Sequence, residues 1–167
     1  MKRLISILFL MILTLSGCAV KEIPARECVT DTLDPPSAPD FYMTAELPAE
    51  ARLEDSCEEG RFAVFSDGSY EIYKEIFPAA SAEAGLLAVT GKTADQLEPI
   101  PVSSFPQPEY RFAWTATGEE GPLSCTGTLI YDGKYCYALT IRCPPAREKN
   151  CREVFMDILN HVTLNEV

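Results

Sequence analysis

The chain has 167 residues, a formal net charge of −11 and a hydrophobic content of 47%. This length fits one ordinary domain with a real core, and the acidic balance argues against nucleic acid or anionic lipid as a partner of the domain surface. Acidity of this kind mostly provides solubility.

The first residues read as an export signal. Lys2 and Arg3 make a short positive region, and residues 4–13 make an apolar segment that suits a signal peptide but is short for a membrane span. The sequence LSGC at residues 15–18 follows, and it resembles the lipobox of bacterial lipoproteins. The resemblance implies a diacylglycerol on Cys18, cleavage before it, and a lipid-anchored protein on the extracytoplasmic side of the cell membrane. The alternatives are an ordinary buried cysteine after a signal peptide and an uncleaved membrane helix.

The rest of the chain divides at a proline-rich stretch. We expect a signal peptide at 1–17, a lipid-anchored flexible linker at 18–40 and a single α+β domain at 41–167.

Two Asp-Gly pairs predict β-hairpins, because a two-residue type I′ turn needs positive φ at both central residues and Asp-Gly tolerates this. Asp67-Gly68 joins strands 61–66 and 69–77, and Asp132-Gly133 joins strands 123–131 and 134–142. A strand at 109–117 extends the second hairpin to a three-stranded meander. Two-residue turns fix the register. The predicted facing pairs are Leu129 with Cys136, Gly127 with Ala138, Cys125 with Thr140 and, across the preceding loop, Thr117 with Pro122.

The predicted register gives the meander two different faces. One face sets large aromatic residues beside small ones, as a packed core layer requires. The members of this face are Tyr110, Phe112 and Trp114, beside Leu129, Gly127 and Cys125. The other face has threonines across its middle and tyrosines and aliphatic residues at one side. We expect an antiparallel sheet with helices packed on it, on both faces or on one face fully and the other in part.

Two helices are predicted beside the sheet. An apolar stripe at helical spacing marks the last helix, and it consists of Cys151, Val154, Phe155, Ile158, Leu159 and Val162. A shorter helix is expected at 82–90, with Ser81 as N-cap and Gly91 beyond its end, followed by a turn at 93–97.

This order of elements resembles the PsbP-like family of bacterial lipoproteins and photosystem accessory proteins. The matching features are the early hairpin, the segments LLAVTGKTADQL, YRFAWTATGEEG and GTLIYDGKYCYALTIRC, and the terminal helix. The resemblance implies an α/β/α sandwich, and it carries no catalytic residues to transfer.

Six cysteines remain after Cys18, namely Cys28, Cys57, Cys125, Cys136, Cys143 and Cys151. An even number in an exported protein suggests disulfides, and no C-x-x-C or finger spacing supports a metal site. The predicted register holds Cys125 and Cys136 too far apart to bond. Cys143 ends the last long strand and Cys151 begins the helical stripe, so these two are expected to form the bridge if the protein contains one. The alternative is that both stay reduced.

No motif carries a recognisable catalytic chemistry. Gly91-Lys92-Thr93 lacks the earlier glycine of a phosphate-binding loop, and the glutamate pairs at 58–59 and 119–120 are typical of solvated turns. The sole histidine, His161, lies near the end of the last helix, where a cation is favourable. We therefore expect no catalytic residue, no metal and no cofactor.

One surface could still bind a ligand. Arg111, Tyr135 and Tyr137, with the threonine strip, could line a shallow groove for a peptide, a glycan or a small ligand, unless a helix covers them. The sequence thus predicts a membrane-anchored cell-envelope lipoprotein that acts as a non-enzymatic binding or accessory module, with an envelope protein, peptide or glycan as ligand. The alternatives are an envelope hydrolase built from scattered carboxylates and His161, and a structural subunit of an envelope complex.

Overall fold

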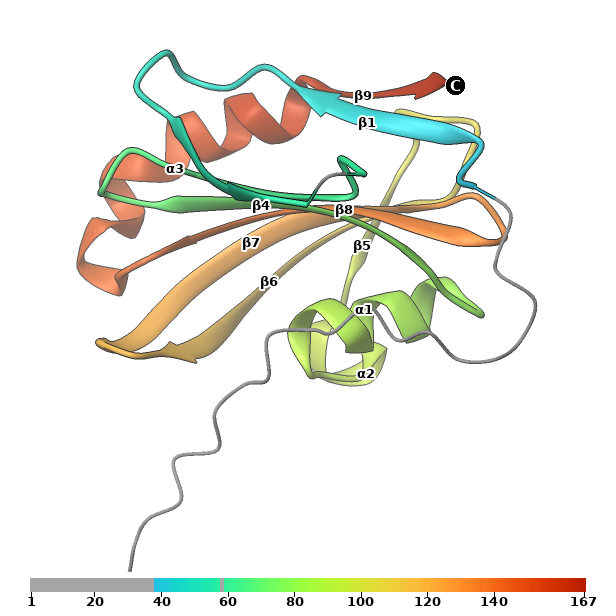
Figure 1. Cartoon of the computed structure of the whole chain (residues 1–167). Coiled ribbons are helices and arrows are strands. Elements are labelled where there is room, and N and C mark those ends of the chain that lie inside the picture. The colour runs from blue at the N-terminus through green and yellow to red at the C-terminus, as the bar shows by residue number, and fades with distance from the viewer. Residues whose placement is uncertain (1–37, 58) are drawn as a thin grey trace, which may run out of the picture. The chain divides into compact units, whose positions relative to one another are not determined.

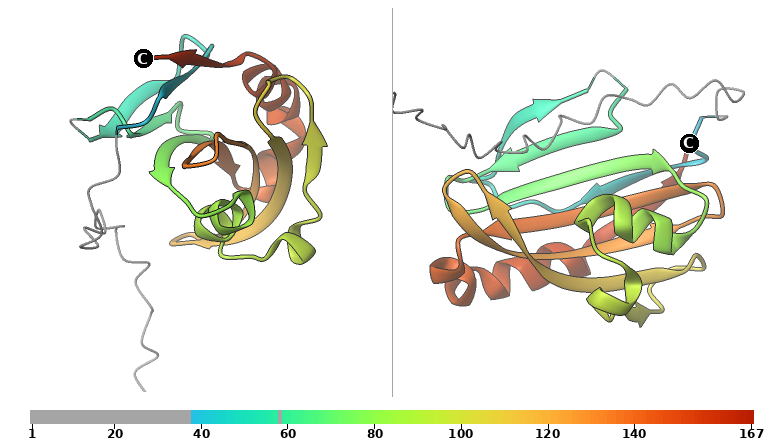
Figure 2. Two further views of the ribbon diagram at one scale, coloured as in Figure 1. Left: turned by 90° about the vertical axis from the view of Figure 1, so that its right-hand side faces the viewer. Right: turned by 90° about the horizontal axis from the view of Figure 1, so that it is seen from below.

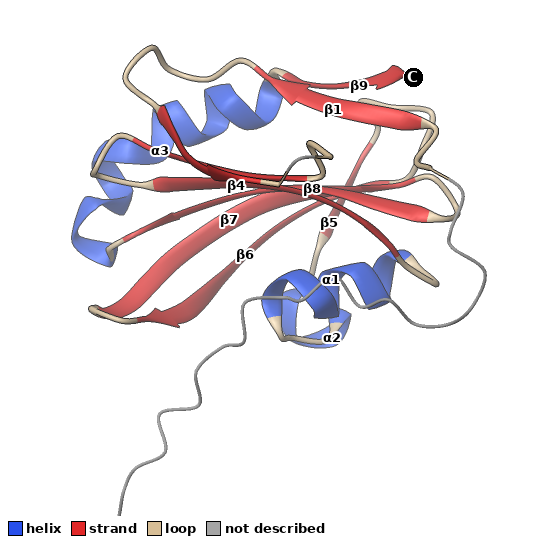
Figure 3. Cartoon of the chain, viewed as in Figure 1, coloured by secondary structure: helices blue, strands red, loops and turns tan. Residues whose placement is uncertain are grey.

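A computed structural model describes residues 38–57 and 59–167. The predicted signal peptide, Cys18, Cys28, Glu58 and most of the linker lie outside these residues. The domain is made of antiparallel sheets with helices packed on them, which confirms the predicted α+β class (Figures 1 and 3).

Seven strands form the main sheet, in the order β2-β3-β4-β8-β7-β6-β5. They are β2 (Arg52–Ser56), β3 (Phe62–Ser66), β4 (Glu71–Pro78), β5 (Ile100–Val102), β6 (Glu109–Gly118), β7 (Gly121–Tyr131) and β8 (Tyr135–Cys143). The predicted early hairpin is β3–β4 and the predicted meander is β6–β7–β8, and the two join into one sheet because β4 pairs along β8. A separate two-stranded sheet pairs β1 (Phe41–Ala45) with β9 (Val162–Glu166).

Capping residues define both ends of helix α1. Helix α1 (Ala82–Thr90) has the predicted bounds: the Ser81 hydroxyl accepts the Ala84 N–H at 3.1 Å, and Gly91, at φ 71°, donates its N–H to Leu87 at 2.8 Å. The expected turn at 93–97 is a short helix, α2 (Ala94–Leu97). Helix α3 (Pro145–Asn160) follows β8 directly.

The predicted stripe of α3 is correct except at its end. Cys151, Phe155, Ile158 and Leu159 are buried, but Val162 is not helical and begins β9. The helix ends at Asn160, two residues before the end of the apolar spacing, because the chain extends again to pair with β1.

The predicted register of the β7–β8 hairpin is wrong by two residues. Cys125 faces Arg142 in place of Thr140, and Gly127 faces Thr140 in place of Ala138. The cause is the Asp132 carboxylate, whose Oδ1 accepts the N–H groups of Lys134 and Tyr135 and so tightens the turn around Gly133 and Lys134.

The same shift moves Leu129 from Cys136 to Ala138, yet a shift of two leaves every side chain on its predicted face. Across the preceding loop, Thr117 does pair with Pro122, as predicted.

Two hydrophobic clusters lie on opposite faces of the main sheet. In Figure 1, α1 and α2 lie below the sheet, while α3 and the β1–β9 ribbon lie above it. Figure 2 shows the sheet curving around α1. The lower cluster contains the predicted pairing of large with small residues: Phe112 and Trp114 pack beside Gly127 and Cys125. A Cβ at Gly127 would lie 3.3 Å from Phe112 Cζ and 2.8 Å from the Leu139 carbonyl oxygen, so the glycine makes room for the ring.

Candidate functional site

The structure does not open a groove at the three predicted groove residues. Tyr135 and Tyr137 are 1% and 0% exposed, because β1, β9 and α3 cover that part of the upper face. Phe41 packs edge-on against Tyr137 with 6.2 Å between ring centroids, and the Tyr137 hydroxyl donates to Asp132 Oδ2 at 2.7 Å. Both tyrosines are therefore core residues.

Arg111 fastens the end of helix α3 to the sheet. Its guanidinium donates to the Leu159 carbonyl at 3.1 Å and to the Asn160 side chain at 2.8 Å, where a cation also complements the helix dipole. The Arg111 Nε lies 3.7 Å from the buried Glu109 carboxylate, which accepts the Thr128 hydroxyl at 2.9 Å. We assign Arg111 a structural role.

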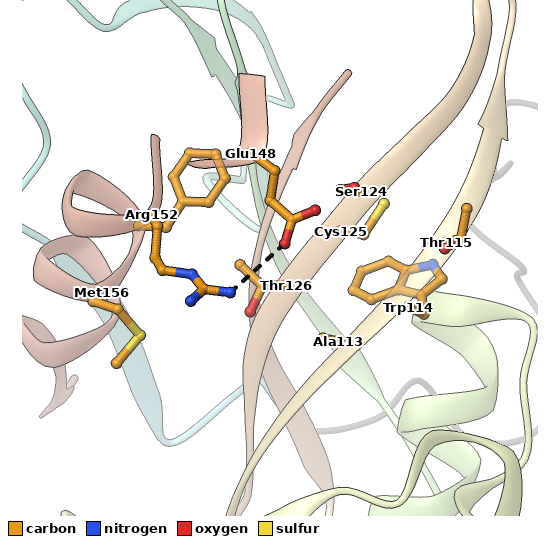
Figure 4. Close-up of a pocket in the computed structure, with 10 residues that line it drawn as sticks. Ala113, Trp114, Thr115, Ser124, Cys125, Thr126, Glu148, Arg152 and Met156 are labelled. Carbon is orange, nitrogen blue, oxygen red and sulfur yellow. Dashed lines mark ion pairs between the residues drawn. The ribbon is translucent and has the colours of Figure 1, made fainter. Parts of the chain in front are cut away.

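The same face remains open at its other end, beside the tip of the β6–β7 hairpin. Helix α3 passes over β7 and β8 and leaves a cavity of about 580 Å³ between its first turns and the hairpin. We call this cavity the α3 groove (Figure 4). Its lining residues are Ala113, Trp114, Thr115, Ser124, Cys125, Thr126, Glu148, Arg152, Phe155 and Met156.

The α3 groove offers hydroxyl, apolar and charged contacts. Thr115, Ser124 and Thr126 form a strip of hydroxyl groups on the sheet side, and Met156, which is 47% exposed, contributes an apolar side chain from α3. Arg152 and Glu148 form an exposed ion pair at 4.0 Å that other charges can replace. This combination is suited to holding a ligand.

The groove lacks an activated thiol. Burial raises the pKa of Cys125, so that this residue stays a neutral thiol at neutral pH and is a poor nucleophile.

The sequence identified only the sheet side of this groove. The sequence predicts the mixed face of the sheet and its threonine strip, but it predicts the groove beside Tyr135 and Tyr137 and not at the other end of that face. The sequence does not predict the α3 side of the groove, because the helix is predicted from its apolar stripe and Glu148, Arg152 and Met156 lie outside that stripe. Their position opposite the threonines depends on how far α3 reaches along the sheet, which a helical spacing does not encode.

A second, smaller cavity of about 250 Å³ lies near the β1–β9 ribbon. Its lining includes Phe41, Tyr42, Arg61 and Ile76. Arg61 is paired with Glu59 at 3.1 Å, and nothing else in this cavity points to a ligand.

His161 lies apart from both cavities. It ends α3, and its Nδ1 is 3.2 Å from the Asp157 carboxylate and 2.9 Å from the Asp157 carbonyl oxygen. Within residues 38–57 and 59–167, no group of three or more His, Cys, Asp or Glu side chains is placed to hold a metal ion.

The thiols of Cys143 and Cys151 are both free and buried in the structure. Burial, with Cys151 close by, raises the pKa of Cys143 to about 11. The two residues share the upper hydrophobic cluster, and their bridge stays a prediction. Cys125 and Cys136 are also free thiols.

The architecture can be compared with solved structures. LpqN of Mycobacterium tuberculosis, a protein involved in cell envelope biogenesis, superposes with a TM-score of 0.53 and 8% sequence identity, over 78% of this chain and 87% of LpqN. The fold resembles that of LpqN. Two weaker likenesses are to a Bacteroides thetaiotaomicron protein and to PA94 of Pseudomonas aeruginosa, a protein of unknown function. The first has a TM-score of 0.49 and 7% identity, over 76% of this chain and 48% of that one. PA94 has a TM-score of 0.42 and 18% identity, over 69% of this chain and 92% of PA94.

No protein-family model matches the chain, and no curated protein matches it. In the part of the chain that the structure describes, no helix combines the length and the apolar character needed to cross a bilayer.

Proposed function

We propose that this protein is a lipid-anchored lipoprotein of the cell envelope whose domain acts as a non-enzymatic binding or accessory module. The observation that carries the proposal is the sequence LSGC at residues 15–18, directly after a basic and apolar start. In bacterial lipoproteins this pattern directs lipid attachment to the cysteine, which is Cys18 in this chain. The tether places the domain at the extracytoplasmic surface of the cell membrane, and the PsbP-like resemblance of the sequence agrees with that address.

The likeness to LpqN supports the same setting. LpqN is involved in cell envelope biogenesis, and a domain of similar architecture behind a lipobox fits an accessory role in the same compartment. The likeness carries no catalytic residue to this chain.

The α3 groove is the binding surface in this proposal. It presents three hydroxyl groups, an exposed methionine and a replaceable ion pair, and it lies between two rigid elements, α3 and the β6–β7 hairpin. A site on rigid elements loses little entropy when it binds.

A pair of groove variants tests the proposal in the full-length protein extracted from its native membranes. Ala113→Trp puts a bulky ring into the groove, and Thr117→Trp puts the same ring on the same exposed face of β6 but beyond the groove. We expect wild type and Thr117→Trp to retain the same protein, peptide or glycan, and Ala113→Trp to lose it.

Other outcomes identify the alternatives. Turnover of an ester, glycoside or peptide that His161→Ala abolishes would favour the hydrolase. A partner bound equally by all three groove forms would favour a structural subunit that uses another surface. Failure to retain any partner or ligand would contradict the binding module.

A further inference from the structure

Strand β6 has an open edge. Strand β5 pairs only with its first residues, from Val102 opposite Glu109 to Ile100 opposite Arg111, while β6 continues to Gly118. In the described residues no other strand pairs with 112–118 on that side, and β6 runs well past β5 toward the hairpin tip in Figure 1. The backbone groups on this edge are free to pair with another chain.

The register shows which backbone groups face outward. Pro101 lies opposite Tyr110 and has no N–H, so the hydrogen bonds to β5 belong to Glu109 and Arg111. In an antiparallel sheet the N–H and C=O of one residue point to the same side, and this side alternates along the strand. The outward groups beyond β5 are therefore those of Ala113, Thr115 and Thr117, which we call the open edge.

The open edge carries none of the usual protection against pairing. Residues 112–118 include no proline and no charged side chain, and their pairing with β7 continues without a bulge. The opposite edge of the sheet is different, because β2 carries Arg52, Glu54 and Asp55 and its register shifts between Leu53 and Asp55. Natural proteins protect exposed edges with such charges and bulges. An unprotected edge on the same sheet indicates a surface that is covered in the working protein.

The open edge also borders the α3 groove. The side chains of Ala113 and Thr115 line the groove (Figure 4), so a strand added beside them would direct alternate side chains to the face of the sheet on which α3 lies. Backbone pairing would supply affinity, and the groove would select side chains.

Acidic side chains lie at both ends of the open edge, and they favour a binding partner with basic residues. Glu119 and Glu120 form the hairpin tip at one end, and Glu98 lies two residues before β5 at the other. A second copy paired about Thr115 would bring its own acidic tip toward Glu98, where like charges repel. A segment with lysine or arginine at its ends meets opposite charges at both.

We propose that the open edge binds an extended, basic-flanked segment of a partner protein by strand addition, with the groove receiving the side chains that face α3. This inference rests on the proposed binding role and names the ligand class for it.

Synthetic peptides test the inference against the full-length protein in detergent. The probes are acetylated peptides of alternating valine and threonine, with paired lysines or paired glutamates at both ends, and their dissociation constants are measured by fluorescence anisotropy. We expect the lysine-flanked peptide to bind at least tenfold more tightly. Thr115→Pro removes one outward N–H and keeps the bonds to β7, so it should weaken binding at least tenfold. Thr115→Ser, which keeps both the N–H and the hydroxyl group, should bind at least tenfold more tightly than Thr115→Pro.

Peptide N-methylation tests the pairing without altering the protein. Methyl groups on one alternate set of amides should abolish binding, and methyl groups on the other set should not. Equal binding of both methylated sets, no binding of the lysine-flanked peptide, or equal affinity for Thr115→Pro and Thr115→Ser would overturn the inference. So would a dimer, seen by light scattering, that Thr115→Pro dissociates.

The two proposals fail in different ways. If a partner from native membranes is retained by wild type and by Thr115→Pro alike, the binding role stands and strand addition is wrong. If neither form retains a partner, the proposed function itself fails.

Discussion

Asp132 stabilises the β7–β8 hairpin through three hydrogen bonds, and its replacement by alanine tests the reasoning about this turn. Its Oδ1 accepts the N–H groups of Lys134 at 2.8 Å and Tyr135 at 2.7 Å, and its Oδ2 accepts the hydroxyl of Tyr137 at 2.7 Å. Because Tyr137 is fully buried, Asp132→Ala removes the acceptor of a phenolic hydroxyl that water does not reach.

The magnitude follows from these contacts. A buried donor left unsatisfied costs about 1–3 kcal/mol, and the loss of a side-chain cap costs about 1 kcal/mol. We expect Asp132→Ala to lower the free energy of unfolding by about 2–4 kcal/mol, a large part of the roughly 5–15 kcal/mol of a typical domain. The matched control is Asp67→Ala. Asp67 makes the same turn bonds, and both go to backbone N–H groups, those of Ser69 and Tyr70, so about 1 kcal/mol is expected there.

The pH dependence of stability gives a second readout. Burial by itself raises the pKa of Asp132, but the Tyr135 N–H, the Tyr137 hydroxyl and the Lys134 N–H outweigh it, and the pKa is lowered. A carboxyl group with a lowered pKa in the folded state contributes stability above its unfolded pKa, about 3.9, and loses it as the pH falls through the folded pKa. Wild type should therefore lose more stability than Asp132→Asn when the pH falls from neutral to below about 4.

Urea unfolding followed by the fluorescence of Trp114, the sole tryptophan, measures these free energies. Adding Tyr137→Phe to Asp132→Ala removes the hydroxyl that has lost its acceptor, and it should raise the free energy of unfolding by about 1 kcal/mol relative to Asp132→Ala alone. Equal losses for Asp132→Ala and Asp67→Ala, with no recovery in the double variant, would refute the role of the carboxylate in holding Tyr137.

Two further changes probe the core. A Cβ at Gly85 would overlap Cys136 Sγ, so Gly85→Ala should destabilise the domain by about 1–3 kcal/mol in urea unfolding, although alanine has the better helix propensity. Adding Cys136→Ala to this variant should restore most of the lost stability. A neutral or stabilising Gly85→Ala would mean that α1 moves to accommodate the methyl group. We expect Cys143 and Cys151 to be bridged in protein freshly purified from its envelope, so that denaturing, non-reducing alkylation labels neither residue, and labelling of both would end this prediction.

Local signals explain what the sequence predicted well. Ser81 and Gly91 bound α1 because a cap and a left-handed residue act within one turn of chain. The faces of β6 and β7 were correct because alternation along a strand survives a register shift of two. The shift itself was missed because the central residues of the turn are Gly133 and Lys134: the Asp132 N–H donates to the Tyr135 carbonyl, and the Asp132 carboxylate accepts the N–H groups of Lys134 and Tyr135.

Non-local pairings explain the rest. Strands β1 and β9 come from opposite ends of the domain, and each has five residues with no clear pattern, so neither was expected. Their pairing covers the two tyrosines that the sequence placed in a groove, and it ends α3 before Val162. The α3 groove was missed for the same reason, since its position depends on the packing of a helix over a sheet and not on either pattern alone.

The central claim is that Cys18 carries the lipid that holds this domain at the membrane, and the intact mass of the protein extracted from its native membrane with detergent tests it most directly. We predict the mass of residues 18–167 plus a diacylglyceryl group, and we predict that Cys18→Ser abolishes both the modification and the processing. A mature chain that begins at another residue, or a Cys18→Ser protein that is still processed and still fractionates with the membrane, would contradict the account.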